Sequence, residues 1–359
     1  MKVCILGDSI SSLTLAKALV NQKIHVDILA QKSVQNFSKS RTIGISKSNT
    51  DFFNKNILNI EKILWKLKKI EIFTDNLKNE KLLNFKNNNN HLFSIVKNHE
   101  LYQILKKDLL KSKYFRTKTS NNKNLSFINN YEIIINCNYF HKVTNKFFSK
   151  KIIKKYNSFA YTTLIKHKKI LNDTAVQIFT KNGPLAFLPI SNKETSIVYS
   201  VNRLINSNSE NIEKLIKIYN YKYEIKKIEK INKFELKSLN LRSYHHNNIL
   251  AFGDLLHKIH PLAGQGFNMT IRDIRIFADI IKDKLSLGLP LDSSINIDFE
   301  NKMKHKNLIF SSGVDLIHEF FNLERKSNNN ILSKSVQLIG INPVLNKIFT
   351  KIADKGILF

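Results

Sequence analysis

The chain has 359 residues, which corresponds to about two domains of ordinary size, and 42% of them are hydrophobic. This composition supports a sizeable core and excludes a wholly disordered chain, and no apolar run approaches the roughly 18 residues of a transmembrane helix. The net charge of +30 comes largely from lysines spread along the whole sequence, in no recognisable nucleic-acid module. We therefore expect a basic surface and no nucleic-acid partner.

The cysteines and the first residues indicate a cytoplasmic protein. Cys4 and Cys137 both lie in apolar runs, which argues for a reducing compartment and against a disulfide framework or a zinc site. The histidines show no metal-ligand spacing, so no bound metal is expected. The apolar run Val3–Leu6 is followed by no small-residue cleavage site, and it is typical of a first strand rather than a signal peptide.

The N-terminal segment predicts a strand, a turn, a helix and a second strand. Val3–Leu6 and Val26–Leu29 have the apolar composition of buried parallel strands, and the apolar face of Leu13–Val20 is helical. A right-handed crossover places the helix N-terminus at the carboxyl ends of both strands. The turn from Gly7 to Ser12 is therefore predicted to lie at that edge of the sheet.

The middle of the chain predicts a helix, one more buried strand and then several strands. The apolar spacing of His99–Lys111 is helical, and Tyr131–Cys137 has a buried-strand pattern. Between Phe159 and Asn202 four short apolar runs predict strands, with a hairpin signal at Asn182-Gly183. The polar stretch Ser209–Lys227 is expected to be helical.

The last third predicts a strand followed by a long helix and by a helical tail. Ile249–Phe252 is a buried-strand pattern that ends at Gly253-Asp254. A long helix is expected to begin near Gly264 and to end at Gly288. Two or three amphipathic helices are expected from about residue 298 to the C-terminus.

The segment from Gly253 to Asp273 has the composition of a ligand-binding loop. Glycines at a helix start, here Gly264 and Gly266, allow a ligand to approach backbone N–H groups, and the helix dipole favours negative charge there. The carboxylate of Asp254, just past a strand end, can accept hydrogen bonds from ligand hydroxyls. The alternative is a loop capped by Asp254 in which the two glycines serve only a tight turn.

The same segment resembles the second flavin-binding motif of the aromatic-hydroxylase flavoproteins, most closely the ubiquinone-biosynthesis monooxygenases. The family's pieces occur here in the family's order: Gly253-Asp254, His260-Pro261, Ala263-Gly264-Gln265-Gly266, and Asn268 followed by Arg272-Asp273. Two other segments are similar to the family's arginine-bearing segment and to its substrate-domain strands, namely Arg41–Ser46 and Gly183–Ile190. The resemblance runs in order from Met1 to about Ile281.

Three segments depart from the family pattern. At the end of the second predicted strand, Ala30-Gln31 stands where the family has an acidic residue that binds the adenosine ribose. The family opens with G-x-G-x-x-G, and the same positions here read Gly7-Asp8-Ser9-Ile10-Ser11-Ser12, with serine at the second and third glycine positions. The middle glycine allows backbone to approach a pyrophosphate, and Asp8 adds a negative charge nearby. The family's Ala-Asp-Gly strand end is replaced by a strand leading to Asn138, without Asp or Gly.

The resemblance implies an α/β (mixed α+β) fold in which a Rossmann-like FAD-binding domain carries an inserted β-sheet substrate domain. The discontinuous FAD-binding domain would comprise residues 1–60, 96–158 and 246–290, and the substrate domain residues 61–95 and 159–245. Residues 291–359 would form C-terminal helices.

The resemblance implies an FAD-dependent monooxygenase that hydroxylates the aromatic ring of a polyprenylated ubiquinone precursor, with NADH or NADPH as electron donor and O₂ as co-substrate. An alternative from another class is a degenerate homologue that serves as a non-catalytic subunit of a quinone-biosynthesis complex. A flavin reductase acting on prenyl double bonds is a third reading. A polyprenylated substrate also implies peripheral contact with an anionic membrane at its inner face, and contact with other subunits of such a complex.

The resemblance also implies the roles of individual residues. The helix start would face the flavin pyrimidine edge, Asp254 would hold the ribitol chain, and Arg41 would approach the flavin or its pyrophosphate. Pro261 and His260 are the catalytic candidates, Pro261 by shaping the loop over the flavin and His260 by proton transfer, against the alternative that His260 only packs. The full set of cofactor-binding candidates is Gly7, Ser9, Ser12, Arg41, Asp254, Pro261, Gly264, Gln265, Gly266, Phe267 and Asn268.

Overall fold

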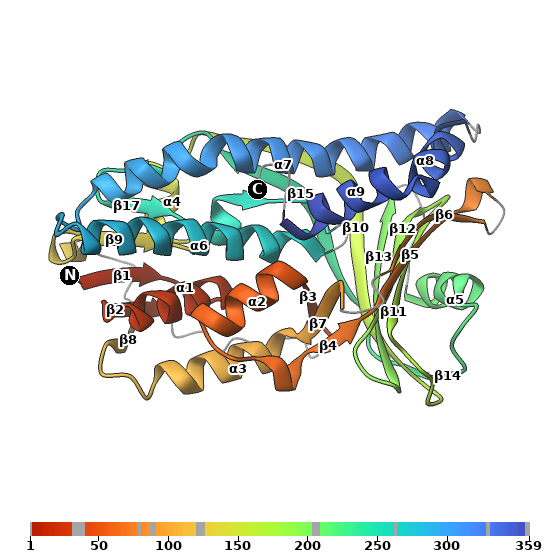
Figure 1. The fold of residues 1–359 in the computed structure, drawn as a ribbon, viewed down its shortest axis with the longest axis horizontal. Helices are drawn as coiled ribbons and strands as arrows, with labels where there is room; N and C mark the ends of the chain where they lie inside the picture. The colour runs from red at the N-terminus through yellow and green to blue at the C-terminus, as the bar shows by residue number, and fades with distance from the viewer. Residues whose placement is uncertain are drawn as a thin grey trace.

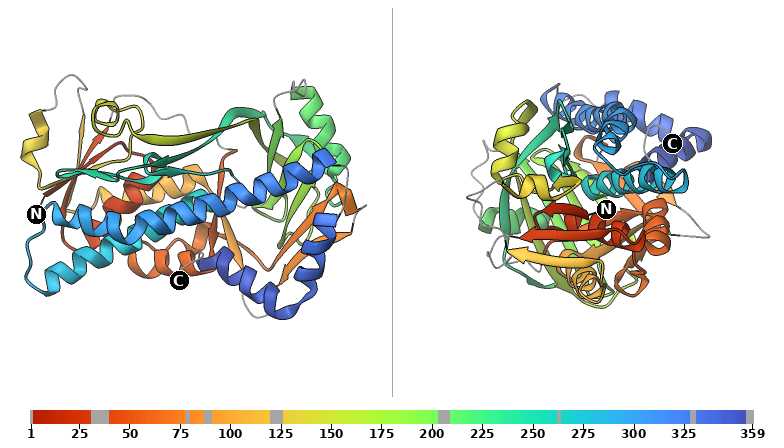
Figure 2. Two further views of the ribbon diagram at one scale, coloured as in Figure 1. Left: turned by 90° about the horizontal axis from the view of Figure 1, so that it is seen from above. Right: turned by 90° about the vertical axis from the view of Figure 1, so that its left-hand side faces the viewer.

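A computed structural model describes residues 2–30, 40–77, 80–86, 91–119, 126–202, 209–261, 264–327 and 331–355. Within these ranges, a parallel sheet with its helices lies at one end of an elongated molecule, and a large antiparallel sheet lies at the other (Figure 1). The long helix α7, Ser294–Ser327, runs over both (Figures 1 and 2). This confirms the predicted mixed α/β fold.

The first sheet explains why the apolar N-terminal strand is fully buried. Its described strands lie in the order β16-β17-β9-β1-β2-β8, and all neighbours are parallel except β16 and β17. Parallel sheets are covered on both faces, so their central strands carry continuous apolar runs such as Val3–Leu6 in β1. The bounds are β1 Lys2–Leu6, β2 His25–Ala30, β8 Phe115–Thr119, β9 Ile133–Asn136, β16 His245–His246 and β17 Ile249–Ala251.

The strand order reverses between β1 and β9. From β1 the chain builds outward through β2 and β8, and it then returns to the other side of β1 with β9 and β17. In open α/β sheets, ligands bind in the crevice at the carboxyl ends of the strands where this reversal occurs. The turn after Leu6 and the segment after Asn136 therefore border the expected ligand crevice.

Two predicted helices, α1 and α6, are among the helices that cover this sheet. The predicted first helix is α1, Ile10–Asn21, and the predicted long helix is α6, Gln265–Ser286, which packs against α1. Gly288 has φ +65°, the left-handed conformation that ends helices, so the predicted stop of α6 is confirmed. The other helices of this part are α2 Lys47–Asn56, α3 Asn98–Leu109 and α4 Lys142–Phe147.

The second sheet has the described order β18-β15-β10-β13-β12-β11-β5-β6, with β14 paired to β10. Its described pairs are antiparallel except β5 and β11, which are parallel, and we call it the antiparallel sheet. Its long strands are β10 Lys151–His167 and β15 Asn232–Leu241, and its other strands are β5 Lys69–Thr74, β6 Lys81–Lys86, β11 Thr174–Thr180, β12 Gly183–Pro189, β13 Glu194–Asn202, β14 Ile225–Ile228 and β18 His257–Lys258. A small sheet of β3 Thr42–Ser46, β7 Phe93–Lys97 and β4 Trp65–Leu67 lies between the two large ones. The domain boundaries proposed from the sequence stay a prediction.

One predicted helix is too long. The helical interpretation of Ser209–Lys227 is wrong beyond Tyr219, because α5 spans Ser209–Tyr219 and the chain then forms β14. The Asn220 side chain accepts from the Tyr223 backbone N–H at 2.9 Å and donates to the Tyr223 carbonyl at 2.6 Å, which closes a turn. An asparagine side chain that satisfies nearby backbone groups in this way competes with helix continuation.

Three helices form the C-terminal part, as the sequence predicts. After α7 come α8, Ile331–Ile341, and α9, Pro343–Lys355. Helix α8 packs against β6 of the large antiparallel sheet, and α9 reaches back to α2 and β3 of the other end (Figure 1). In the ranges that the structure describes, no helix combines the length and apolar character needed to cross a membrane.

Candidate functional site

The first glycine of the N-terminal turn is required by its surroundings. Gly7 has φ +99°, and a Cβ atom placed on it would lie 3.2 Å from the Cβ of Asn138. Its N–H donates to the Leu29 carbonyl at 3.0 Å, which holds the turn against β2. The sequence-predicted residue Gly7 therefore lies at the strand-order reversal, where the ends of β1 and β9 meet.

The two serines that stand in glycine positions cap the helix that follows. Ser9 is the N-cap of α1 and accepts from the Ser12 N–H at 3.3 Å, and the two hydroxyls lie 3.0 Å apart. Asp8 accepts a hydrogen bond from the Tyr102 hydroxyl at 3.2 Å, and Lys106 donates to that hydroxyl. The Asp8 carboxylate is thus held by α3.

Asp254 lies beside this turn. Gly253, with φ +63°, passes so close to α1 that an added Cβ would lie 3.0 Å from the Cβ of Ser11. Burial raises the pKa of the Cys137 thiol to about 12, its hydrogen bond with Ser12 opposes this, and the negative charge of Asp254 raises it further. Asp254 is exposed, and among the described residues its carboxylate makes no hydrogen bond or ion pair. It is therefore available to a ligand.

The start of α6 has no capping side chain. Gly264 is the N-cap, with φ +64° and no capping side chain, and the first turn contains no acidic residue. A Cβ on Gly264 would lie 3.5 Å from the backbone of Gly44, whereas a Cβ on Gly266 would meet no atom of the described residues within 4 Å. Gln265 is buried, and Phe267 is half-buried against the core of the parallel-sheet domain.

Asn268 holds this helix start against β3 and α2. Its fully buried side chain accepts from the Ser46 N–H and from the Asn49 amide, both at 2.9 Å. It donates to the Gly44 carbonyl at 3.0 Å and to the Gly264 carbonyl at 3.2 Å. All four hydrogen bonds are internal, so Asn268 serves the predicted site as a support.

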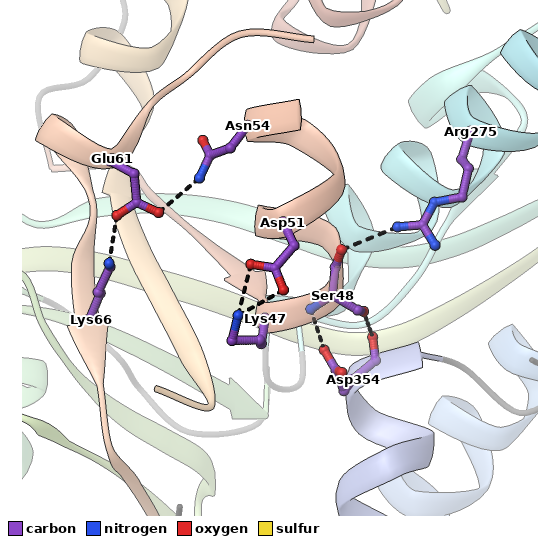
Figure 3. A network of polar contacts seen from close by, with 8 residues as sticks. All are labelled: Lys47, Ser48, Asp51, Asn54, Glu61, Lys66, Arg275 and Asp354. Atoms are coloured by element: carbon purple, nitrogen blue, oxygen red, sulfur yellow. Dashed lines mark hydrogen bonds and ion pairs between the residues drawn. The ribbon is translucent and has the colours of Figure 1, made fainter. Parts of the chain in front are cut away.

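The C-terminal helix α9 reinforces the same support (Figure 3). Asp354 Oδ1 accepts from the Ser48 N–H at 2.8 Å, in the first turn of α2, whose N-cap Ser46 makes no capping hydrogen bond. The Asp354 carbonyl accepts from the hydroxyls of Ser46 and Ser48, and Arg275 donates to the Ser48 carbonyl at 3.1 Å. A carboxylate from the far end of the chain thus caps α2.

The two catalytic candidates and the neighbouring His257 differ in their surroundings. His260 is 1% exposed, and its ring packs edge-on against Tyr156 and lies 4.6 Å from the ring of His318. His257 Nε2 lies 2.5 Å from an Asp273 carboxylate oxygen, in a buried pair that ties the loop to α6. Pro261 follows His260 at partial exposure. Proton transfer by His260 stays a prediction.

A small polar cavity lies between the antiparallel sheet and α7, next to Tyr156 and His318, the two rings that contact His260. It encloses about 320 Å³ including its open mouth, and Tyr156 and His318 are among its lining residues, with Ser158, Gly183, Pro184, Ser200 and Asn202. Three aromatic side chains of this sheet lie outside the cavity lining. Phe187 and Tyr199 are buried in the core of the sheet, and Phe179 stacks on Phe321 of α7.

The structure thus brings the predicted residues together in two groups. Gly7, Ser9, Ser12 and Asp254 line the carboxyl edge of β1 and β9, and Gly264–Asn268 begin the adjacent helix. Arg41 is exposed just before β3, and His260 faces the antiparallel sheet. Sequence reasoning missed Asn49, Gly44 as a contact of Gly264, and Asp354. Of these three residues, only Gly44 lies in a segment, Arg41–Ser46, whose sequence resembles the aromatic-hydroxylase flavoproteins.

A comparison with protein families gives an independent match at this site. Residues 163–285 match the family described as FAD binding domain, and this range contains Asp254 and the whole of α6 up to its last turn. Over this range the chain is similar to FAD-binding domains. The turn from Gly7 to Ser12 lies outside the matched range.

Curated relatives of this chain include monooxygenases of ubiquinone biosynthesis. It is 28% identical over 156 residues to the 3-demethoxyubiquinol 3-hydroxylase of Escherichia coli (strain K12), covering 42% of this chain and 40% of that protein. It is 25% identical over 219 residues to the mitochondrial ubiquinone biosynthesis monooxygenase COQ6 of Drosophila melanogaster, covering 50% and 46%. The chain therefore matches less than half of the length of these relatives.

Solved structures agree on the fold over almost the whole chain. The p-nitrophenol 4-monooxygenase PnpA of Pseudomonas putida DLL-E4 superposes with a TM-score of 0.76 at 11% identity, covering 99% of this chain and 98% of that one. Klebsiella pneumoniae HpxO complexed with FAD and uric acid gives a TM-score of 0.76 at 10% identity, covering 99% and 97%. At these identities the likeness is one of fold.

The hydrogen bonds of Asn268 predict a large effect of its removal. Asn268→Ala would leave a buried N–H and two buried carbonyls without their partner, so we expect a loss of about 2–4 kcal/mol in the free energy of unfolding. Asn56→Ala, which removes an exposed amide from the end of α2, should cost no more than about 0.5 kcal/mol. Urea unfolding measures both, and equal stability of the two variants would contradict the supporting role of Asn268.

Proposed function

We propose that this protein is an FAD-dependent monooxygenase that hydroxylates the aromatic ring of a polyprenylated ubiquinone precursor, with NADH or NADPH as electron donor and O₂ as co-substrate. The observation that carries the proposal is the start of α6 at Gly264, which has no capping side chain, beside the Asp254 carboxylate at the strand-order reversal of a parallel sheet. Within the described residues that carboxylate makes no hydrogen bond or ion pair. The names of the curated relatives support the substrate class.

The residues at this edge fit FAD. Gly266 leaves open space before the first N–H groups of α6, which can donate to the flavin ring and stabilise its negative charge when reduced. The Asp254 carboxylate can accept from the ribitol hydroxyls, and the half-buried Ser9 hydroxyl can donate to phosphate. Ser12 is fully buried beneath it. When bound, FAD would supply the electron transfer and the activation of O₂, while the protein positions it and excludes water.

The alternative, a non-catalytic homologue, rests on the two missing glycines of the first turn and on the missing acidic–glycine pair near Asn138. Two observations weigh against it. The replacing serines make a regular helix cap, and the charge of Asp8 is engaged by Tyr102. The turn therefore keeps its helix geometry and adds no free carboxylate at the crevice. Contacts with other subunits of a biosynthetic complex and with an anionic membrane remain part of the proposal.

Asp254→Ala tests the assignment of the loop. The carboxylate makes no contact within the described protein, so we expect unchanged folding and a loss of at least about tenfold in FAD affinity, as removal of a charged hydrogen-bond partner of a ligand predicts. Asp51→Ala is the matched control, because Asp51 is also exposed but pairs with Lys47 on α2. FAD retention, read from visible absorbance after gel filtration, measures both. Equal retention in both variants would remove Asp254 from the site.

Gly266→Ala separates ligand binding from folding. The added methyl group meets no protein atom and alanine favours helix, so the empty protein should be as stable as the wild type or up to about 1 kcal/mol more stable. The methyl group would occupy the space proposed for the flavin, so FAD affinity should fall about tenfold or more. Ser312→Ala, on an exposed face of α7, controls for the helix effect alone. Full FAD affinity in Gly266→Ala would contradict the proposed flavin position.

A further inference from the structure

Three lysines converge on one tyrosine where the antiparallel sheet meets the carboxyl edge of β9. Lys151 Nζ donates to the Tyr139 hydroxyl at 3.0 Å and lies 4.6 Å from its ring centroid, and Lys237 Nζ lies 5.6 Å from the same centroid. Lys258, in β18, is paired with Leu239 of β15, two residues from Lys237 and on the same face. We call Lys151, Lys237 and Lys258 the lysine cluster.

The lysine cluster has no carboxylate partner within the described ranges. Within the described ranges, none of the three lysines forms an ion pair with a carboxylate, although lysines elsewhere on the molecule do so repeatedly. Lys155 stands directly opposite Lys237 in the β10–β15 register, which adds a further like charge. Like charges placed opposite one another destabilise a sheet, so the arrangement costs folding free energy unless an anion neutralises it.

The surroundings of the lysine cluster indicate a ligand with phosphate and a flat ring. Burial lowers the pKa of Lys258, the charge of Asp254 opposes this, and the positive charges of Lys237 and Arg41 lower it further, so the cluster borders the proposed flavin site. Phe140 is 84% exposed, and its ring packs edge-on against Tyr139 at 5.3 Å. An exposed aromatic ring beside several cations can stack a base while the lysines bind phosphates.

We propose that the lysine cluster binds the phosphate groups of a nucleotide other than the flavin, with Phe140 stacking on one of its rings. The assignment rests on the proposed function, in which a nicotinamide dinucleotide must approach the flavin. Together with Arg41, the lysine cluster places four positive charges near the single negative charge of Asp254. This excess of positive charge favours NADPH over NADH, because NADPH carries a 2′-phosphate in addition to its pyrophosphate.

The test compares a charge-removing with a charge-keeping double variant of the full-length chain. NADPH, NADH, inorganic pyrophosphate and FAD are titrated anaerobically by calorimetry into the wild type, into Lys237→Gln/Lys258→Gln and into Lys237→Arg/Lys258→Arg. We expect the glutamine variant to bind NADPH and pyrophosphate at least tenfold more weakly, and to bind FAD within twofold of the wild type. The arginine variant should keep both affinities. Lys226→Gln, at an exposed β14 position on the far half of β10, is the matched control.

Thermal melting gives a second measurement that does not depend on turnover. Pyrophosphate should raise the melting temperature of the wild type, and the glutamine variant should melt at or above the wild-type temperature without pyrophosphate and show no further rise with it. This reflects the removal of like-charge repulsion.

Each contrary result has a distinct meaning. Wild-type affinity for NADPH in the glutamine variant would overturn the assignment. A loss of FAD affinity equal to the loss of NADPH affinity would also overturn it, because the lysine cluster would then bind the flavin nucleotide. Binding to phosphatidylglycerol vesicles that depends on these lysines, with no effect on nucleotides, would overturn it in favour of a lipid surface. A wild type that binds NADPH and pyrophosphate but no FAD would contradict the proposed function while supporting a nucleotide site.

Discussion

The buried amide of Asn268 is the interaction on which the candidate site depends. It joins two pieces of chain that are far apart in sequence. It bonds to Gly44, Ser46 and Asn49, where β3 leads into α2, and to Gly264 at the start of its own helix α6. A side chain with two donors and two acceptor positions can satisfy all of these groups at once. Aspartate or leucine of similar size could not, so the helix start is fixed by one residue type.

This support leaves the ligand-facing groups free. The N-cap Gly264 has no capping side chain, and the carboxylate of Asp254 makes no hydrogen bond or ion pair within the described residues. Asn268, Asp273 and Asp354 instead make the hydrogen bonds that hold the surrounding elements together. The same separation holds at the first turn, where serines replace glycines and cap α1 themselves, and where α3 engages the Asp8 charge. The motif is altered in sequence while the capped start of α1 is retained.

Local patterns in the sequence were sufficient for the parts of the fold that depend on neighbours in the chain. Apolar runs predicted β1, β2 and β9, and the start and stop of α6 followed from Gly264 and Gly288. The long-range contacts were not predictable in this way. Asp354 caps a helix 306 residues earlier in the chain, and the lysine cluster exists only because of the pairing of β10, β15 and β18. No periodicity in the sequence reports a strand register between distant segments.

The central claim is that this edge of the sheet binds FAD in a form that a nicotinamide can reduce. The most direct measurement is the visible absorption spectrum of the purified protein with one equivalent of FAD, recorded before and after anaerobic addition of NADPH. The account predicts a protein-bound flavin spectrum that bleaches with NADPH and returns when air is admitted. A protein that leaves all added FAD free in solution would contradict it.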